Sequence, residues 1–234
     1  MKRYRTASTG LQAAAICAPQ RLSRRGWLGL VGGACGLLAT GSLAQPAPAS
    51  RAGSAAPSFY ENFAGMRLLD QGGKTLQLPA LKGRVVLINF IFTGCSTVCP
   101  VQTHALAELQ RQMKPELRRR VWLLSVSLDA LSDTPQTLRA FAAKYQVDHA
   151  NWSFVTGRPQ DIQRLAEALW LFRNGKGQGP LEEHTTHLWL VDGQGVLRMR
   201  YGGSPPDTGR LVREMAALVE VSAPNVPREA ERRR

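Results

Sequence analysis

The stretch "RVVLINFIFTGCSTVCPVQTHALAELQRQM", Arg84–Met113, decides the fold. Its first nine residues form a near-continuous apolar run, as expected of a strand buried on both faces of a sheet. Its last part, "PVQTHALAELQRQM", carries apolar residues at helical spacing, with Pro100 where the first turn of a helix tolerates proline. Two cysteines, Cys95 and Cys99, lie between these parts. The stretch therefore predicts a buried strand that leads through a cysteine-bearing turn into a helix.

The same alternation continues on both sides of this stretch. Upstream, "MRLLDQGGKTLQL" has two short apolar runs around a Gly-Gly pair, which is a hairpin signal. Downstream, "VWLLSVSLD" and "WSFVTG" are predicted strands, each followed by a predicted helix, "SDTPQTLRAFAAKY" and "RPQDIQRLAEALWLF". A hairpin, "TTHLWLVD" with "VLRMRYGG", and a closing helix, "PDTGRLVREMAALVEV", end the pattern. This order predicts an α/β, thioredoxin-like fold with an extra N-terminal β-hairpin and a central mixed sheet flanked by helices.

The chain divides into four predicted parts. Residues 1–44 are an export signal or a membrane anchor, and 45–57, rich in Pro, Ala and Ser, form a linker. Residues 58–222 form the thioredoxin-like domain, which is long enough to bury one sizeable core. Residues 223–234 are rich in Pro and Arg and are predicted to be a disordered tail.

The first 44 residues carry six Lys or Arg residues and no Asp or Glu, and a moderately apolar stretch follows the charges. Within them "SRRGWLGL", Ser23–Leu30, resembles a twin-arginine export signal. An uncleaved anchor through 27–44 is the alternative, although five glycines make it a marginal span. Both interpretations place the domain in the periplasm, or at the inner membrane facing the periplasm.

The net charge of the chain is +13, and the first 44 residues supply six of these charges, which leaves +7 for the remainder. No basic helix is interleaved with aromatic residues, so we expect no nucleic-acid partner. The basic surface instead suits an acidic protein partner or anionic lipid.

Cys95 and Cys99 form the single cysteine pair beyond the export segment, since Cys17 and Cys35 lie within that segment. A disulfide between them would close a very small loop and so stabilise the fold little. The pair stands at the carboxyl end of a predicted strand and at a helix N-terminus, which lowers the pKa of a thiol. Three interpretations are therefore open: a metal site, a redox-active dithiol and, least favoured, a structural staple.

The four-residue spacing bears on the choice between a metal and a disulfide. Helical residues four apart have Cβ atoms about 5–6 Å apart, whereas a disulfide needs about 3.5–4.5 Å. A disulfide would have to bend the first turn, while a metal between the sulfurs relaxes that demand because a thiolate–metal bond is about 2.3 Å. The spacing permits both states and favours a metal more than C-x-x-C would.

A third metal ligand must come from elsewhere, and the histidines are His104, His149, His184 and His187. His104 is rotated away on the helix, and His149 lies in the polar "VDHANW". His184 opens the strand "TTHLWLVD", at the segment that faces the active-site cysteines in a thioredoxin-like fold. His187 has the opposite parity and is expected on the other face of that strand. His184 is the predicted third ligand.

The chain resembles the Sco/SenC family of copper-binding assembly proteins. The stretches "FIFTGCSTVCP", "SVSLDALSDTP", "WSFVTG" and "HTTHLWLVDGQG" carry the resemblance, which spans Leu68 to about Gly203. The family motif C-x-x-x-C-P falls on Cys95, Cys99 and Pro100, and the distal copper-binding histidine falls on His184. Asp129, followed by Asp133-Thr134-Pro135, matches an acidic loop near the site. In place of the Pro and Asp common after the first cysteine stand Ser96 and Thr97, which should alter thiol pKa and metal preference.

The resemblance implies Cu(I) or Cu(II) bound by Cys95, Cys99 and His184. It implies a copper chaperone that matures a respiratory copper centre such as that of cytochrome c oxidase, with an oxidase subunit or another copper protein as client. Soft thiolates favour Cu(I), and imidazole also accommodates Cu(II). The alternative is a thiol–disulfide oxidoreductase in which Cys95 and Cys99 are the redox-active catalytic pair that reduces client cysteines.

Overall fold

The computed structural model describes residues 57–172, 179–181 and 184–222. The predicted export segment or anchor, the predicted linker up to residue 56 and the predicted tail lie outside the described residues. None of the helices in the described ranges is long and apolar enough to cross a bilayer.

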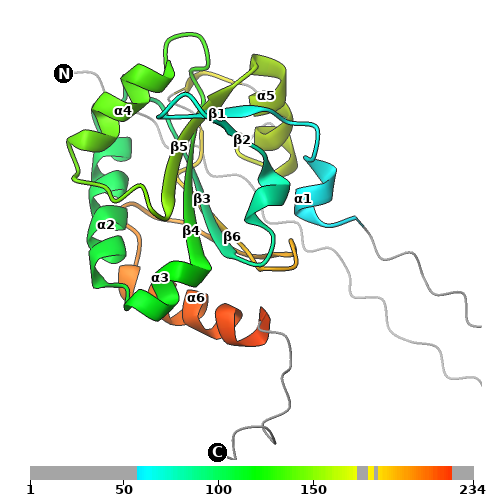
Figure 1. The fold of residues 1–234 in the computed structure, drawn as a ribbon. Coiled ribbons are helices and arrows are strands. Elements are labelled where there is room, and N and C mark those ends of the chain that lie inside the picture. Colours follow the sequence, from blue (N-terminus) through cyan, green and yellow to red (C-terminus); the bar gives the residue numbers. More distant parts are fainter. Residues whose placement is uncertain (1–56, 173–178, 182–183, 223–234) are drawn as a thin grey trace, which may run out of the picture. The chain divides into compact units, whose positions relative to one another are not determined.

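A single seven-stranded mixed sheet organises the domain (Figure 1). Its strands lie in the order β2-β1-β5-β4-β3-β6-β7, with the parallel strands β3, β4 and β5 at the centre. The N-terminal hairpin extends one side by pairing β1 antiparallel to β5, and the late hairpin extends the other by pairing β6 antiparallel to β3. The bounds are β1 Leu68–Asp70, β2 Thr75–Leu76, β3 Val85–Ile91, β4 Val121–Ser127, β5 Trp152–Gly157, β6 Leu188–Val191 and β7 Leu197–Tyr201.

Strand β3 is buried along its whole length, as its apolar run predicts. Alternate residues enter two separate cores: Val86 and Ile88 belong to one, and Val85 and Leu87 to the other. The first core also takes residues from α1 and α5, and the second takes residues from α2, α4 and α6. The sheet is therefore covered by helices on both faces.

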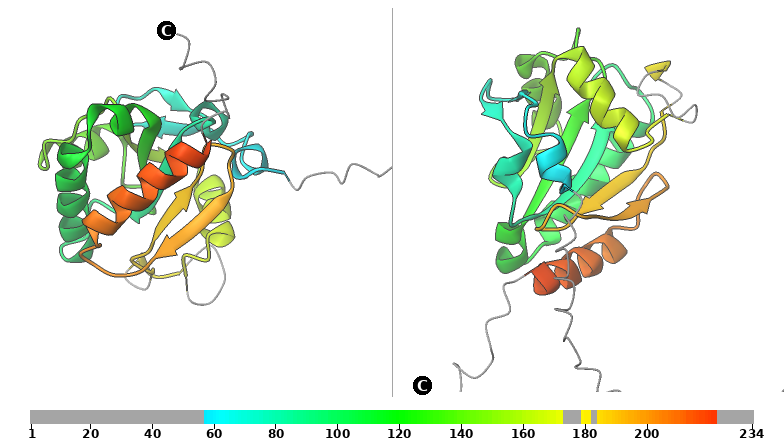
Figure 2. Two further views of the ribbon diagram at one scale, coloured as in Figure 1. Left: turned by 90° about the horizontal axis from the view of Figure 1, so that it is seen from below. Right: turned by 90° about the vertical axis from the view of Figure 1, so that its right-hand side faces the viewer.

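Figures 1 and 2 show this layering, with α2, α4 and α6 on one side of the sheet and α1 and α5 on the other. The α/β class, the mixed sheet with flanking helices and the extra N-terminal hairpin are confirmed. The helices are α1 Phe59–Asn62, α2 Val98–Gln112, α3 Pro115–Arg120, α4 Pro135–Ala143, α5 Pro159–Ala168 and α6 Thr208–Ser222, with a short 3-10 helix at Leu78–Leu81.

Three boundaries near the site differ from the sequence prediction. Helix α2 begins at Val98, two residues before Pro100, because the first N–H groups of a helix have no intrahelical acceptor and proline costs no bond there. Helix α5 ends at Ala168, and Trp170 takes a left-handed backbone with φ of 52°. Strand β6 begins at Leu188, so His184 and His187 precede the strand and the parity argument about them does not apply.

Candidate functional site

Cys95 lies in the turn after β3, and Cys99 lies in the first turn of α2. Both are free thiols, Cys95 half-buried and Cys99 buried. The backbone N–H of Cys99 donates a hydrogen bond to Cys95 Sγ at 3.4 Å, and Thr97 Oγ1 lies 4.0 Å from the same sulfur. Since Cys95 stands outside the helix, the helical i, i+4 geometry used to judge the spacing does not describe this pair.

The two thiols differ in acidity. Partial burial raises the pKa of the Cys95 thiol, but hydrogen bonds from the backbone N–H groups of Cys99, Thr97 and Val98 outweigh burial and bring its pKa below the ordinary value. Burial, and to a smaller extent the neighbouring Cys95, raises the pKa of the Cys99 thiol to about 12. Cys95 is therefore the nucleophilic sulfur, and Cys99 is a protonated partner behind it.

His184 stands at the same end of the sheet as the cysteines. Its ring lies 6.1 Å from the ring of Phe92, measured between centroids, and Phe92 is the residue at which the Cys95 turn begins. His184 also forms an isolated antiparallel bridge with Phe172. Its Nδ1 bonds to the carbonyl oxygen of Leu181, and since a carbonyl can only accept, Nδ1 carries the proton. In a neutral ring this places the lone pair on Nε2, the arrangement that metal-binding histidines use.

The predicted ligands Cys95, Cys99 and His184 come from β3–α2 and from the segment before β6. Among the described residues, no three His, Cys, Asp or Glu side chains are grouped closely enough to hold a metal ion. The other histidines lie elsewhere: His104 and His149 are exposed, and the ring of His187 lies 6.0 Å from that of Trp189. Two of the predicted ligands are thus adjacent, and the third stays a prediction.

A buried polar chain links the cysteine helix to the His184 segment. Gln102, one turn after Cys99 on α2, donates from Nε2 to the carbonyl of Thr186 at 2.9 Å. Its Oε1 accepts from Asn89 of β3 at 3.0 Å, and Asn89 in turn accepts from Ser125 of β4 at 2.7 Å. Sequence reasoning missed these groups, although Asn89 is a polar residue inside an otherwise apolar run.

A second anchor holds the Cys95 turn from the β4–α4 loop. Asp133, which is 1% exposed, accepts the N–H of Thr93 and the hydroxyls of Thr93 and Ser127. From the sequence, Asp133 was only one member of an acidic loop, because nothing along the chain shows that it reaches Thr93, forty residues earlier.

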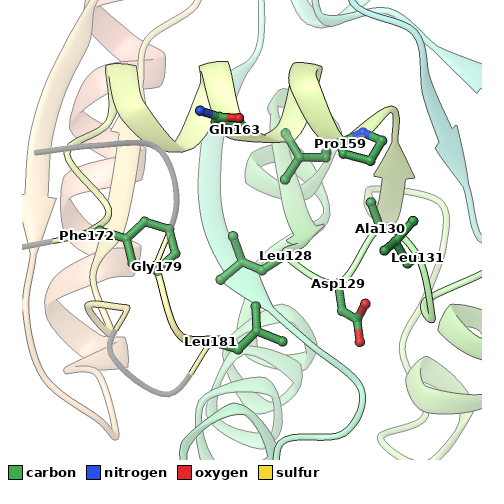
Figure 3. A pocket seen from close by; sticks show the side chains of 10 residues that line it. Leu128, Asp129, Ala130, Leu131, Pro159, Gln163, Phe172, Gly179 and Leu181 are labelled. Carbon is green, nitrogen blue, oxygen red and sulfur yellow. The ribbon is translucent and has the colours of Figure 1, made fainter.

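An apolar pocket of about 250 Å³ lies beside the His184 segment (Figure 3). The β4–α4 loop, α5 and three residues that precede His184, namely Phe172, Gly179 and Leu181, supply its walls. Leu131, on the rim, is 86% exposed. The lining residues are Leu128, Asp129, Ala130, Leu131, Pro159, Ile162, Gln163, Phe172, Gly179 and Leu181.

Comparison with known proteins shows the family. The SCO1/SenC family model matches residues 55–220, nearly the whole described domain. The chain belongs to the SCO1/SenC family. The SCO1 protein homolog of Bacillus subtilis (strain 168) is 36% identical over 136 residues, which cover 57% of this chain and 70% of that protein.

Solved structures of the family share the fold. A SCO1/SenC family lipoprotein from Bacillus anthracis str. Ames is 30% identical, with a TM-score of 0.56 over 65% of this chain and 91% of that one. BsSco, a Sco-family cytochrome c oxidase assembly protein with an identified disulfide switch, is 31% identical, with a TM-score of 0.56 over 65% of this chain and 90% of its own. Copper-bound ScoI of Bradyrhizobium japonicum is 23% identical, with a TM-score of 0.53 over 64% of this chain and 96% of its own, and shows the fold alone. The thioredoxin-like layout predicted from the sequence is that of these proteins.

Proposed function

We propose that this chain is a copper-binding chaperone that matures a respiratory copper centre such as that of cytochrome c oxidase. The observation that carries the proposal is the pair of sulfurs at the head of α2, with the His184 ring beside the same turn. Its relatives support it: BsSco is a member of the Sco family of cytochrome c oxidase assembly proteins, and a protein of Stutzerimonas stutzeri, 32% identical over 136 residues, carries the name "Putative copper-binding protein".

The donor set fits copper. Cys95, with its lowered pKa, is the more easily ionised of the two thiols, and soft thiolates select Cu(I). Cys99 gives up its proton when metal binds, since a thiolate is the ligand form. We propose His184 Nε2 as the third ligand, so the imidazole approaches the sulfurs when copper is held. Imidazole extends the preference to Cu(II), and three ligands leave one side open for a client ligand.

Copper titration of the reduced domain tests this assignment. We expect one copper per chain and, for Cu(II), a thiolate charge-transfer band. His184→Ala should weaken Cu(II) binding and change that band. His104→Ala is the matched control, because its ring is exposed on the same helix as Cys99. An unchanged affinity and spectrum in His184→Ala would show that His184 is not a ligand.

A second function, thiol–disulfide exchange, is favoured by the unequal acidity of the two thiols. The Cys95 thiolate would attack a client disulfide and form a mixed disulfide, with one client sulfur leaving as a thiolate. Cys99 would then lose its proton and attack Cys95 Sγ, which releases the client dithiol and leaves a Cys95–Cys99 disulfide. The client is reduced by two electrons and the pair is oxidised by two.

His184 separates the two functions because exchange needs the thiols alone. At limiting copper in cells, we expect His184→Ala to lower oxidase activity about as far as a deletion does, while the purified variant still reduces a small disulfide. Oxidase activity near wild type in His184→Ala, together with its loss in Cys95→Ser, would replace the chaperone function with the exchange function.

We further propose that the domain works in the periplasm or at the inner membrane facing it, after export by the twin-arginine route. The paired arginines of "SRRGWLGL" support the route, and residues 27–44 would serve as an anchor if the segment is retained. An acidic protein client suits the basic charge of the remaining chain.

A further inference from the structure

We propose that Asp133 is a positioning residue that holds the turn carrying Cys95 and so fixes where the Cys95 sulfur is presented. The inference rests on the proposed use of the Cys95–Cys99 pair, which both functions above require, and does not depend on copper.

Three donors meet the Asp133 carboxylate. Oδ2 accepts the backbone N–H of Thr93 at 3.0 Å and the hydroxyl of Ser127 at 2.5 Å, while Oδ1 accepts the hydroxyl of Thr93 at 2.5 Å. A buried carboxylate is costly unless such bonds compensate it, so its partners are strongly held in place. The side chain thereby joins the end of β4 to the turn that follows β3.

The clamp reaches Cys95 along a short path. Thr93 is two residues before Cys95, and the Cys95 N–H donates to the carbonyl of Phe92 at 3.1 Å to close the turn. That turn sets where Cys95 Sγ meets the N–H of Cys99. If Thr93 is released, the Cys95 turn loses this anchor and the sulfur has no fixed place beside the first turn of α2, so an attacking reagent meets it less often in a productive orientation.

The hydrogen-bonding clamp can be removed or largely kept by substitution at Asp133, which makes the proposal testable. Removing the clamp should slow the reaction of Cys95. Asparagine keeps most of the clamp without the charge, because its oxygen accepts the Thr93 N–H and its amide donates to a hydroxyl oxygen.

The experiment measures the rate at which iodoacetamide alkylates Cys95 at pH 7 in the full-length, reduced, metal-free protein, with the modified residue identified by peptide mass. We expect the rate to fall several-fold in Asp133→Ala and to stay near the wild-type rate in Asp133→Asn. A rate in Asp133→Ala equal to or above wild type would overturn the proposal. Because no copper is present, this outcome says nothing against the proposed copper site.

Asp192 provides the matched control. It is 2% exposed and, like Asp133, accepts several hydrogen bonds, from the N–H groups of Gln194 and Val196 and from Arg198, but it lies at the far end of β6. Asp192→Ala should lower the melting temperature yet leave the alkylation rate unchanged. An equal fall in both variants would mean that general loosening is responsible, and the proposal would fail. If Asp133→Ala does not fold, the same measurement is made on Thr93→Val, which removes the hydroxyl that Asp133 accepts. An unchanged alkylation rate in this folded variant would also overturn the proposal.

Discussion

At the scale of single residues, the two sulfurs of the site differ in burial and in acidity. Cys95 is half-buried with a lowered pKa, and Cys99 is buried with a pKa of about 12. The sequence predicts a reactive pair, because a strand end and a helix start flank it. It does not reveal which sulfur is acidic, since that depends on which N–H groups point at each sulfur and on how deeply each is buried.

The raised pKa of Cys99 makes stability depend on alkaline pH. Its thiol has an ordinary value of 9.0 and a folded value of about 12, so the folded state binds more protons between these limits. The stabilisation is complete below pH 9.0 and is lost as pH rises towards about 12. Urea unfolding across this window should show a falling free energy of unfolding, with a shallower slope in Cys99→Ala. The same slope in that variant would assign the effect to other groups, such as Tyr60, whose pKa burial also raises.

At the scale of elements, the parts of the site come from distant segments that side chains hold together. Gln102 of α2 binds the carbonyl of Thr186 just before β6, and Asp133 binds Thr93 just after β3. The elements themselves follow from apolar periodicity and turn residues. The hydrogen bonds between elements do not follow from these patterns, because the partner of a buried amide or carboxylate is whichever group the fold brings close to it. For this reason the sequence did not predict the Gln102 and Asp133 hydrogen bonds.

The Gln102 link should have a measurable energy. Gln102→Leu leaves the Thr186 carbonyl and the Asn89 amide without their partner, and an unpaired buried group costs about 1–3 kcal/mol. We expect a loss of about that size in the free energy of unfolding. Gln112→Leu, at an exposed position on the same helix, should change it by less than about 0.5 kcal/mol. Similar values for both variants would show that the buried link contributes nothing.

The turn between β6 and β7 supports α1 through Gly195. Its φ is +83°, and a Cβ there would lie 2.8 Å from Tyr60 Cδ2 and 2.9 Å from Ser58 Cβ. Gly83 has a similar φ of +88° with nothing within 4 Å of a Cβ. Gly83→Ala should therefore cost the backbone strain alone, about 1–2 kcal/mol, and Gly195→Ala should cost clearly more. Equal costs by urea unfolding would mean that α1 yields to the added methyl group.

At the scale of the whole molecule, the sequence predicts the class, the order of strands and helices and the added hairpin. Helix α3, Pro115–Arg120, was not predicted because it buries no residue and so shows no apolar periodicity. Helix α1 has a capping box at Ser58 and Glu61 but only four residues, too few for a periodic signal. The boundary of β6 was missed because "TTH" is as compatible with a strand as "LWLV" is, and only pairing with β3 decides where the strand begins.

Export is also a property of the whole chain. If the route is twin-arginine, changing Arg24 and Arg25 together to Lys should keep the protein in the cytoplasm, because the pathway reads the arginine pair rather than its charge. Cell fractionation measures this, and the mass of the exported wild-type form shows whether cleavage occurs near Ala44. Arg3→Lys with Arg5→Lys, outside the motif, is the control. Unimpaired export of the Arg24 and Arg25 variant would rule out this route.

Helix α2 begins with a sulfur where a capping oxygen is usual. Thr97 forms no side-chain cap, and Cys95 Sγ accepts the N–H of Cys99 instead. A metal, a disulfide bond or an alkyl group on this sulfur withdraws electron density from the lone pairs that accept the Cys99 N–H, and so weakens that hydrogen bond. The chemical state of the site is thereby transmitted to a backbone proton. The NMR chemical shift and the hydrogen-exchange rate of the Cys99 amide should therefore report whether Cys95 is a thiolate, oxidised or bound to metal.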